Sequence, residues 1–228
     1  MVIGKINFPI YATFILLSLL LASIYIGINL YKNGIEKNKI GYFITLITSY
    51  AIFGGIILSK ALINDGGLSS YAGAISVIIG AFIYEKLDPN DNNLYMKYSI
   101  ISLPLIYGIS KIGCFFAGCC YGIPYNGILS VTYTNGLNIP LFPIQLLESI
   151  VFIILFLILN KLKNKYDKYI IEITIISASI IKLLLDFLRY SHIYKMISKN
   201  QIISLVFIIV SIILIIKRNF KKWSFFIV

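Results

Sequence analysis

Residues 9–31 read PIYATFILLSLLLASIYIGINLY and contain no Asp, Glu, Lys or Arg. Because a helix rises about 1.5 Å per residue, an uncharged stretch of this length crosses a hydrocarbon core of roughly 30 Å. Similar stretches recur along the chain, in which 59% of the 228 residues are hydrophobic and 13% are charged. This composition excludes a soluble globular domain and predicts an all-α integral membrane protein.

Seven transmembrane helices are predicted within a single polytopic membrane domain that comprises residues 1–228. The expected spans are 9–31, 40–59, 69–84, 98–117, 143–160, 168–188 and 201–217. The first apolar stretch lacks a small-residue cleavage site followed by a polar start, so we interpret it as a retained helix rather than a signal peptide. Residues 118–142 lack a strong helical signal and are expected to form an outer-face loop or half-helix.

The lysine and arginine residues predict the orientation of these spans. An N-terminus outside the cell leaves 13 of them in the inner loops and tail and four in the outer segments. The positive-inside rule expects this asymmetry, so we place the C-terminus in the cytoplasm and the protein in the cell membrane. The net charge of +11 lies in short loops between apolar spans, and we therefore expect no nucleic-acid partner.

Three ionisable residues follow one face of the sixth predicted span. Lys182, Asp186 and Arg189 are spaced i, i+4 and i+7, near the outer end of the helix. A charge inside a bilayer is costly, so these groups need partners or a function. One interpretation is an internally paired stripe that packs helices together. The other is an anion site for a phosphodiester headgroup, because Arg offers a fork to phosphate oxygens and Lys a point charge.

The segment 111–122, KIGCFFAGCCYG, combines a cation, Lys111, with thiols and glycines. Its glycines permit close helix approach and a chain break, and they are Gly113, Gly118 and Gly122. Its thiols are the chain's three cysteines, Cys114, Cys119 and Cys120. Inert packing, a disulfide and a reactive thiol beside the lysine all remain open. We expect no metal site, because the only histidine is His192 and no second Cys pair completes a tetrahedron.

Polar residues also mark the starts of two other predicted spans. Gln145 and Glu148 stand three apart at the start of the fifth span and would face the bundle interior. Glu148 could neutralise Lys111 or Lys182, orient a substrate or accept a proton. Tyr71, at the start of the third span, offers a hydroxyl donor. His192 is interpreted as an interfacial residue, since the local spacing supplies no group to orient it.

Five segments resemble motifs of the bacterial prolipoprotein diacylglyceryl transferases. Residues 110–122, SKIGCFFAGCCYG, are similar to the family's Gly-Arg-Ile-Gly-Asn-Phe-x-x-Gly-Glu-x-x-Gly. Residues 142–148, FPIQLLE, resemble His-Pro-x-Gln-Leu-Tyr-Glu, and residues 182–189, KLLLDFLR, resemble Arg-Phe-x-x-Glu-x-x-Arg. Residues 69–73, SSYAG, resemble Ser-Phe-His-Gly-Gly, with tyrosine in place of histidine. Asn200-Gln201 is similar to the family's Gly-Gln ahead of the last span.

The resemblance implies a seven-span bacterial enzyme of lipoprotein biosynthesis that needs no cofactor. Such enzymes move a diacylglyceryl group from phosphatidylglycerol to the cysteine of a secreted lipoprotein precursor, with release of glycerol phosphate. Carried onto this chain, it implies phosphate binding by Lys111, Lys182 and Arg189. It further implies that Glu148 and Asp186 hold those cations, that Gln145 and Tyr71 contact the headgroup, and that the glycines shape the loop.

The sequence leaves two alternatives to this transfer. The first is a different lipid or thiol transfer in which Cys119 or Cys120 carries the group covalently. The second is a phospholipid-binding membrane protein that keeps the fold without the reaction, because a fold does not fix a function.

Overall fold

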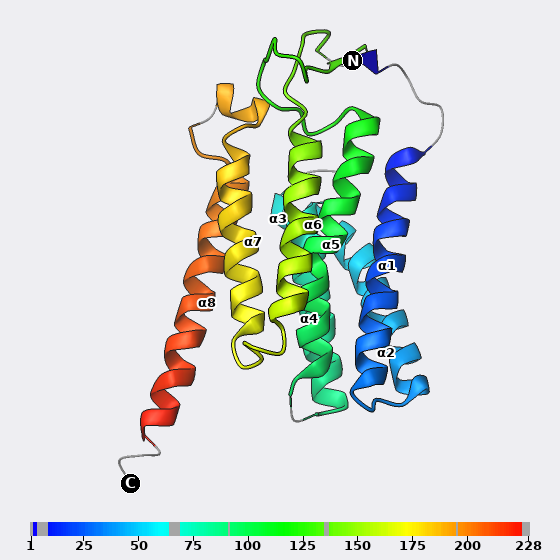
Figure 1. Cartoon of the computed structure of the whole chain (residues 1–228), viewed down its shortest axis with the longest axis vertical. Coiled ribbons are helices and arrows are strands. Elements are labelled where there is room, and N and C mark those ends of the chain that lie inside the picture. Colours follow the sequence, from blue (N-terminus) through cyan, green and yellow to red (C-terminus); the bar gives the residue numbers. More distant parts are fainter. Residues whose placement is uncertain are drawn as a thin grey trace.

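A computed structural model of the protein describes residues 2–3, 9–63, 69–90, 92–134, 137–194 and 196–224. The bundle in Figure 1 is built from long helices with short connections. The α-helices are α1 (Ile10–Lys32), α2 (Lys37–Ser49), α3 (Gly55–Ile63), α4 (Ser70–Leu87), α5 (Leu94–Ala117), α6 (Ile144–Leu162), α7 (Ile170–Asp186) and α8 (Lys199–Ser224). The remaining elements are a π-helical turn η1 (Tyr50–Gly54), a 3-10 helix η2 (Tyr190–Ile193) and the strands β1 (Val2–Ile3) and β2 (Thr132–Tyr133).

The prediction of an all-α membrane protein is confirmed. Within the described residues, six helical segments are long and apolar enough to cross a membrane. They are Ile10–Lys32, Lys37–Ala61, Ser70–Leu87, Leu94–Ala117, Ile144–Leu162 and Lys199–Asn219. The second of these runs through α2, η1 and the first part of α3, so the π-helical turn widens a continuous helix without ending it. The predicted span 168–188 corresponds to α7, which is 17 residues long.

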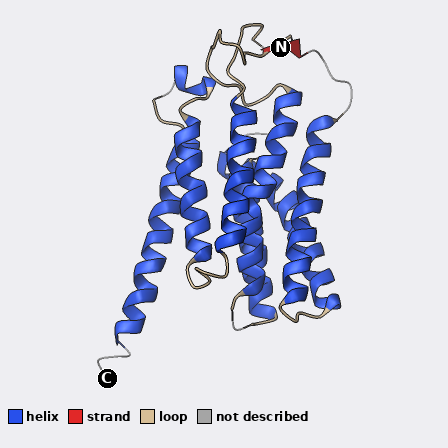
Figure 2. Ribbon diagram, in the orientation of Figure 1, coloured by secondary structure: helices blue, strands red, loops and turns tan. Residues whose placement is uncertain are grey.

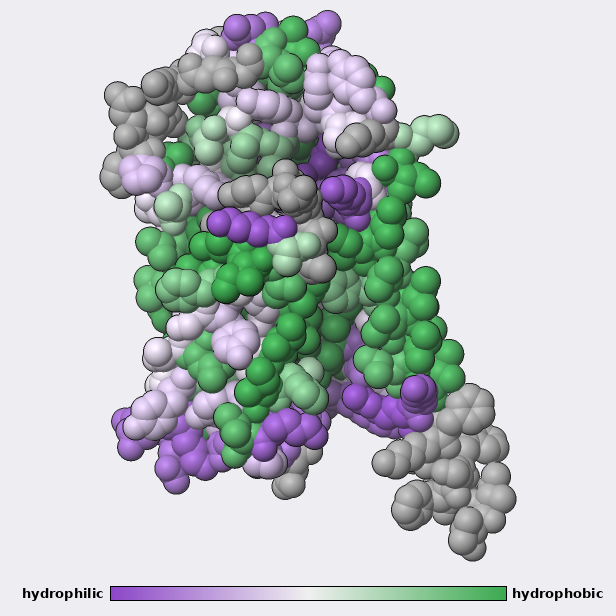
Figure 3. All heavy atoms as spheres, turned by 180° about the vertical axis from the view of Figure 1, so that it is seen from behind, coloured by the Kyte–Doolittle hydropathy of each residue, from purple (hydrophilic) through white to green (hydrophobic). Residues whose placement is uncertain are grey.

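Helix α5 lies at the centre of the bundle, where it packs against α1, α4, α6 and α7. It carries the most buried residues of the long helices, among them the fully buried Tyr95, Ile100 and Ile101. By contrast, α1 and α8 expose rows of Leu and Ile side chains. Figure 3 shows these apolar surfaces as a broad band, with hydrophilic residues gathered at the end of the bundle drawn lowest. This is the surface expected of a protein whose helical bundle is surrounded by lipid along its middle part.

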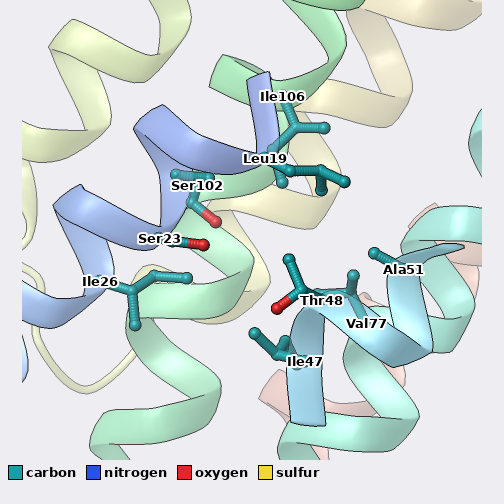
Figure 4. A pocket seen from close by; sticks show the side chains of 10 residues that line it. Leu19, Ser23, Ile26, Ile47, Thr48, Ala51, Val77, Ser102 and Ile106 are labelled. Carbon is teal, nitrogen blue, oxygen red and sulfur yellow. The ribbon is translucent and has the colours of Figure 1, made fainter. Parts of the chain in front are cut away.

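A small cavity lies between α1, α2, α4 and α5 (Figure 4). Its volume is about 20 Å³, and its wall includes Leu19, Ile47, Val77 and Ile106. A space of this size holds about one water molecule and cannot admit a lipid headgroup. The lipid-binding groups predicted from the sequence lie elsewhere.

Residues 118–142 form a loop rather than a half-helix among the described residues (Figure 2). Strand β2 within it pairs in parallel with β1, so the N-terminal strand lies against this loop. Isolated backbone bridges connect Pro124 to Leu141 and Gly122 to Arg189. We call the end of the bundle that carries this loop the loop end; α5 finishes there and α6 begins there.

Candidate active site

The charged residues predicted as site residues come together at the loop end, on three neighbouring helices. Lys111 lies in the last turns of α5, Glu148 in the second turn of α6, and Lys182 and Asp186 in the last turns of α7. Arg189 follows α7 directly, where its backbone bridges to Gly122 in the loop. We call these five residues the ion cluster.

Glu148 lies at the centre of the ion cluster and is fully buried, with 0% of its surface exposed. Its Oε2 lies 2.9 Å from Lys111 Nζ, and its Oε1 lies 2.5 Å from Arg189 Nη2. The hydroxyl of Tyr107 donates a further hydrogen bond of 2.9 Å to Oε1. A carboxylate that binds two cations in this way offsets the cost of burying all three charges.

Asp186, which is 2% exposed, connects the end of α7 to the segment that follows it. Its Oδ1 lies 3.3 Å from Arg189 Nε and accepts a 3.3 Å hydrogen bond from Asn200. Its Oδ2 lies 3.0 Å from His192 Nε2 and accepts a hydrogen bond from the hydroxyl of Ser198. Asp186 thus contacts Arg189 as well as three residues of the segment that follows it.

Lys182 differs from the other cations, because no carboxylate of the described residues lies within 4.0 Å of its Nζ. Its ammonium donates a 2.8 Å hydrogen bond to Ser70 Oγ. It also lies 3.5 Å from the ring centroid of Tyr71 and 4.5 Å from that of Tyr107. Aromatic faces attract a cation without neutralising it. With three cations and two carboxylates, the ion cluster keeps one positive charge, and Lys182 is where a carboxylate is missing.

Tyr71 presents its ring to Lys182 and its hydroxyl to α8. The hydroxyl donates a 3.1 Å hydrogen bond to Asn200 O and shares another with the hydroxyl of Ser204. The ring stacks on Phe207, with centroids 6.2 Å apart. The hydroxyl expected from the sequence to contact a headgroup therefore has partners on α8.

Gln145 and the glycines position the loop against the ion cluster. The side chain of Gln145 is buried and donates a 2.7 Å hydrogen bond to the carbonyl of Cys119. Gly118 ends α5 in the left-handed conformation, with φ of 62°. At Gly122, a Cβ atom would lie 2.3 Å from Phe142 O, so only glycine permits this approach. Gly113 allows α1 to pass close to α5, because a Cβ there would lie 2.8 Å from Phe14 Cβ.

The three cysteines are free thiols at the junction of α5 and the loop. Cys114 is buried, Cys119 is half-buried and Cys120 is exposed. Their Sγ atoms all lie within 4.8 Å of one another. Spacing along the chain could not show this proximity, since it depends on the left-handed turn at Gly118.

Sequence reasoning missed several partners in the site. It assigned no orienting group to His192, whereas the structure places Asp186 3.0 Å away, because η2 turns the chain back toward α7. It also missed Tyr107, although this residue lies four positions before Lys111 on the same face of α5. Ser70 and Asn200 lie in segments that resemble family motifs, but sequence reasoning gave them no role, and it did not single out Ser198.

Comparisons with known proteins agree with this architecture. Residues 1–217 match the family described as "Prolipoprotein diacylglyceryl transferase". A phosphatidylglycerol--prolipoprotein diacylglyceryl transferase of Clostridium tetani (strain Massachusetts / E88) is 30% identical over 199 residues, covering 83% of this chain and 78% of the relative. A second such enzyme, from Clostridium perfringens (strain 13 / Type A) and named transferase 2, is 28% identical and covers 84% and 83%. The chain belongs to the prolipoprotein diacylglyceryl transferase family.

Proposed function

We propose that this protein transfers the diacylglyceryl group of phosphatidylglycerol to a cysteine thiol of a secreted lipoprotein precursor. The observation that supports the proposal most directly is Lys182, a buried lysine beside the ion pairs of Glu148 that has no carboxylate partner among the described residues. A phosphodiester headgroup carries one negative charge and would complete the cluster. The names of its relatives specify the same donor and acceptor, which favours this transfer over one that uses Cys119 or Cys120 as a carrier.

We further propose seven spans, with the N-terminus outside and the C-terminus in the cytoplasm of the cell membrane. Helix α7, with 17 residues, lies beside α6 and α8 and supplies the seventh span. The hydrophilic end opposite the loop end holds Lys32 and Lys37, which flank the connection after α1, and the lysine-rich connection after α6, as the positive-inside rule expects for a cytoplasmic face. The loop end then faces outward, toward secreted precursors.

In the proposed reaction, the thiolate of the precursor attacks the glyceryl carbon that is bonded to a phosphate oxygen. A C–S bond forms, the C–O bond breaks, and glycerol phosphate leaves with the electron pair. Lys182 binds a non-bridging phosphate oxygen, while Lys111 and Arg189 supply the positive field that stabilises charge on the leaving phosphate. Glu148 and Asp186 hold these two cations at fixed positions, so little reorganisation is needed during the reaction.

The thiol proton needs an acceptor, and His192 is the residue that we propose. It is the only imidazole in the chain, and Asp186 orients its ring through Nε2. Its Nδ1 is then the nitrogen that can take the proton. His192 and Asp186 are thus arranged as a general base and the carboxylate that orients it.

Tyr71 is proposed as a positioning residue for Lys182, since its ring lies 3.5 Å from the ammonium and its hydroxyl bonds to α8. Replacing it by phenylalanine keeps the aromatic face, so Tyr71→Phe should retain transfer within about threefold. Tyr71→Leu removes a cation–π interaction of roughly 1 to 2 kcal/mol and should lower the rate by about tenfold. Initial rates of glycerol phosphate release measure both. Equal losses in the two variants would instead assign a chemical role to the hydroxyl.

Lys182→Met should raise the KM for phosphatidylglycerol by about tenfold or more, because a charged hydrogen bond contributes roughly 1.5 to 3 kcal/mol. The matched control is Lys97→Met, which removes another buried lysine of the bundle, one that pairs with Asp167. Lys97→Met should leave this KM unchanged even if it lowers stability. An unchanged KM in Lys182→Met would remove Lys182 from the phosphate site.

The donor half of the reaction is tested with purified protein in vesicles. Release of glycerol phosphate should require both phosphatidylglycerol and a peptide with the lipobox cysteine, and it should disappear in the double variant Lys182→Ala, Arg189→Ala. Vesicles of phosphatidylcholine supply the control donor. Phosphatidylglycerol binding without release, under any peptide concentration, would contradict the proposed transfer.

A further inference from the structure

The three cysteine thiols form a compact cluster that the transfer reaction does not use. Their Sγ atoms lie within 4.8 Å of one another, although Cys114 belongs to α5 and the other two belong to the loop. They are also all free. Sequence spacing disfavoured a metal site because no second Cys pair is present, but that expectation considered a site with four protein ligands. Three thiolates with an open fourth position are a different case.

The sulfur positions suit one metal ion. Metal–sulfur bonds of about 2.3 Å place the sulfurs of a single site roughly 4 Å apart, which small side-chain rotations reach from the observed arrangement. The backbone conformation of residues 118–120 brings Cys119 and Cys120 back toward Cys114. Gly118 and Cys120 both have positive φ, 62° and 58°, and the N–H of Cys119 returns to donate to Cys114 O at 3.2 Å. A positive φ is uncommon for a residue other than glycine and is maintained here by the surrounding contacts.

Contacts from outside the cluster preorganise it further. Gln145 on α6 donates to the carbonyl of Cys119 at 2.7 Å. The N–H of Ile123 donates to Leu188 O, and the N–H of Tyr190 donates to Tyr121 O, each at 3.0 Å. The loop that carries two of the three thiols is therefore fastened to α6 and to the segment after α7 before any ligand binds.

The charges around the cluster favour thiolates, the forms that bind metals. Lys111 lies three residues before Cys114 on α5, and the backbone of Arg189 bridges to Gly122, two residues after Cys120, so two cations lie beside the thiols. Among the described residues, the ligand atoms gathered here are those of the three cysteines alone, and His192 is not one of this group.

We propose that Cys114, Cys119 and Cys120 form a binding site for one thiophilic d10 metal ion, Zn²⁺ or Cu⁺, with any fourth position open to water beside Cys120. Each thiol that binds the ion releases its proton. Soft thiolate ligands select these ions over Mg²⁺ or Ca²⁺. The ion would fasten the loop to the end of α5. The family motif places Asn and Glu at the positions of Cys114 and Cys119, so the site is particular to chains with this cysteine pattern.

The test uses the full-length protein in detergent micelles, with its thiols reduced and the reductant then removed without oxygen. Zn²⁺ is titrated against a chromophoric chelator, Cu⁺ against a Cu⁺-selective chelator, and Cd²⁺ is added separately to reveal thiolate-to-metal charge transfer in the ultraviolet. We expect one ion per chain and a Cd²⁺ charge-transfer band. The two competition series decide which of the two ions is held more tightly.

The single variants Cys119→Ser and Cys120→Ser should each weaken binding by at least about tenfold, the loss that even an outer-shell partner can cause. These two positions are partly or fully exposed, so the variants are expected to fold, whereas Cys114→Ser alters a buried position. A matched control carries one isolated thiol. In this variant all three cysteines are changed to serine, and the exposed Ser191 is changed to cysteine. It should bind no ion tightly.

Two results would overturn the proposal: no stoichiometric binding by the reduced wild type, or equal binding by the protein without cysteines. Neither measurement uses lipid or peptide, so a failure here leaves the proposed transfer untouched. Conversely, a negative result in the transfer assay would not contradict the proposed metal site.

Discussion

The variant Glu148→Gln is expected to lower kcat/KM for transfer by about 100-fold or more. Glu148 is the one carboxylate that binds both Lys111 and Arg189, and glutamine matches its shape while removing its charge. Breaking a buried ion pair costs roughly 3 to 5 kcal/mol, and about 1.36 kcal/mol corresponds to a tenfold change in rate. The two cations would no longer be held where charge develops on the leaving phosphate. Rates of glycerol phosphate release give the ratio directly.

Glu172→Gln is the matched control for this variant. Glu172 is also buried in the bundle, in the first turn of α7, and it pairs with Arg218 at 2.9 Å. It lies at the opposite end from the ion cluster, so its loss should lower thermal stability with little effect on kcat/KM. Equal effects of the two variants on kcat/KM would mean that Glu148 acts through stability alone.

His192→Gln is expected to lower kcat by about 100-fold, the lower part of the range for removing a general base. The glutamine amide can still donate a hydrogen bond to Asp186, as His192 Nε2 does at 3.0 Å, but it cannot take the thiol proton. The variant therefore separates proton transfer from positioning. Stopped time courses with the lipobox peptide at saturating phosphatidylglycerol measure kcat.

Chemical rescue gives the complementary result for His192. In His192→Ala, free imidazole should restore part of the rate in a concentration-dependent way, because it supplies the missing base in the space that the side chain leaves. If His192→Gln keeps the wild-type kcat, then His192 only orients Asp186, and the base lies elsewhere.

In the structure, Lys182 and Asp186 lie in α7, and Arg189 follows the helix, bound to Asp186 and Glu148. The helical spacing of these residues was enough to predict a charged face on one helix. It did not predict their pairing. The sequence left open an internally paired stripe without naming the pairs, and in the structure Asp186 binds Arg189 and also His192. Lys182 turns toward aromatic rings from α4 and α5. Periodicity identifies the face of a helix, but the partners on that face come from the packing of other helices.

Contacts within the loop 118–142 were even less predictable from sequence periodicity. Its apolar and glycine content predicted a break after α5, but the approach of Cys114 to Cys119 and Cys120 depends on left-handed residues and on backbone bridges to distant segments. Likewise, His192 contacts Asp186 because of the 3-10 helix η2, which no periodic sequence pattern predicts. The charged residues of the ion cluster could be singled out from the sequence, whereas Tyr107 on α5 and the contacts made through irregular backbone could not.

The central claim, transfer of a diacylglyceryl group to a thiol, is tested most directly by the mass of the acceptor peptide after incubation with the protein in phosphatidylglycerol vesicles. The account predicts that wild-type protein adds one diacylglyceryl group to the lipobox cysteine through a thioether, and that Glu148→Gln adds almost none in the same time. An unmodified peptide, with folded wild-type protein and bound phosphatidylglycerol, would contradict it.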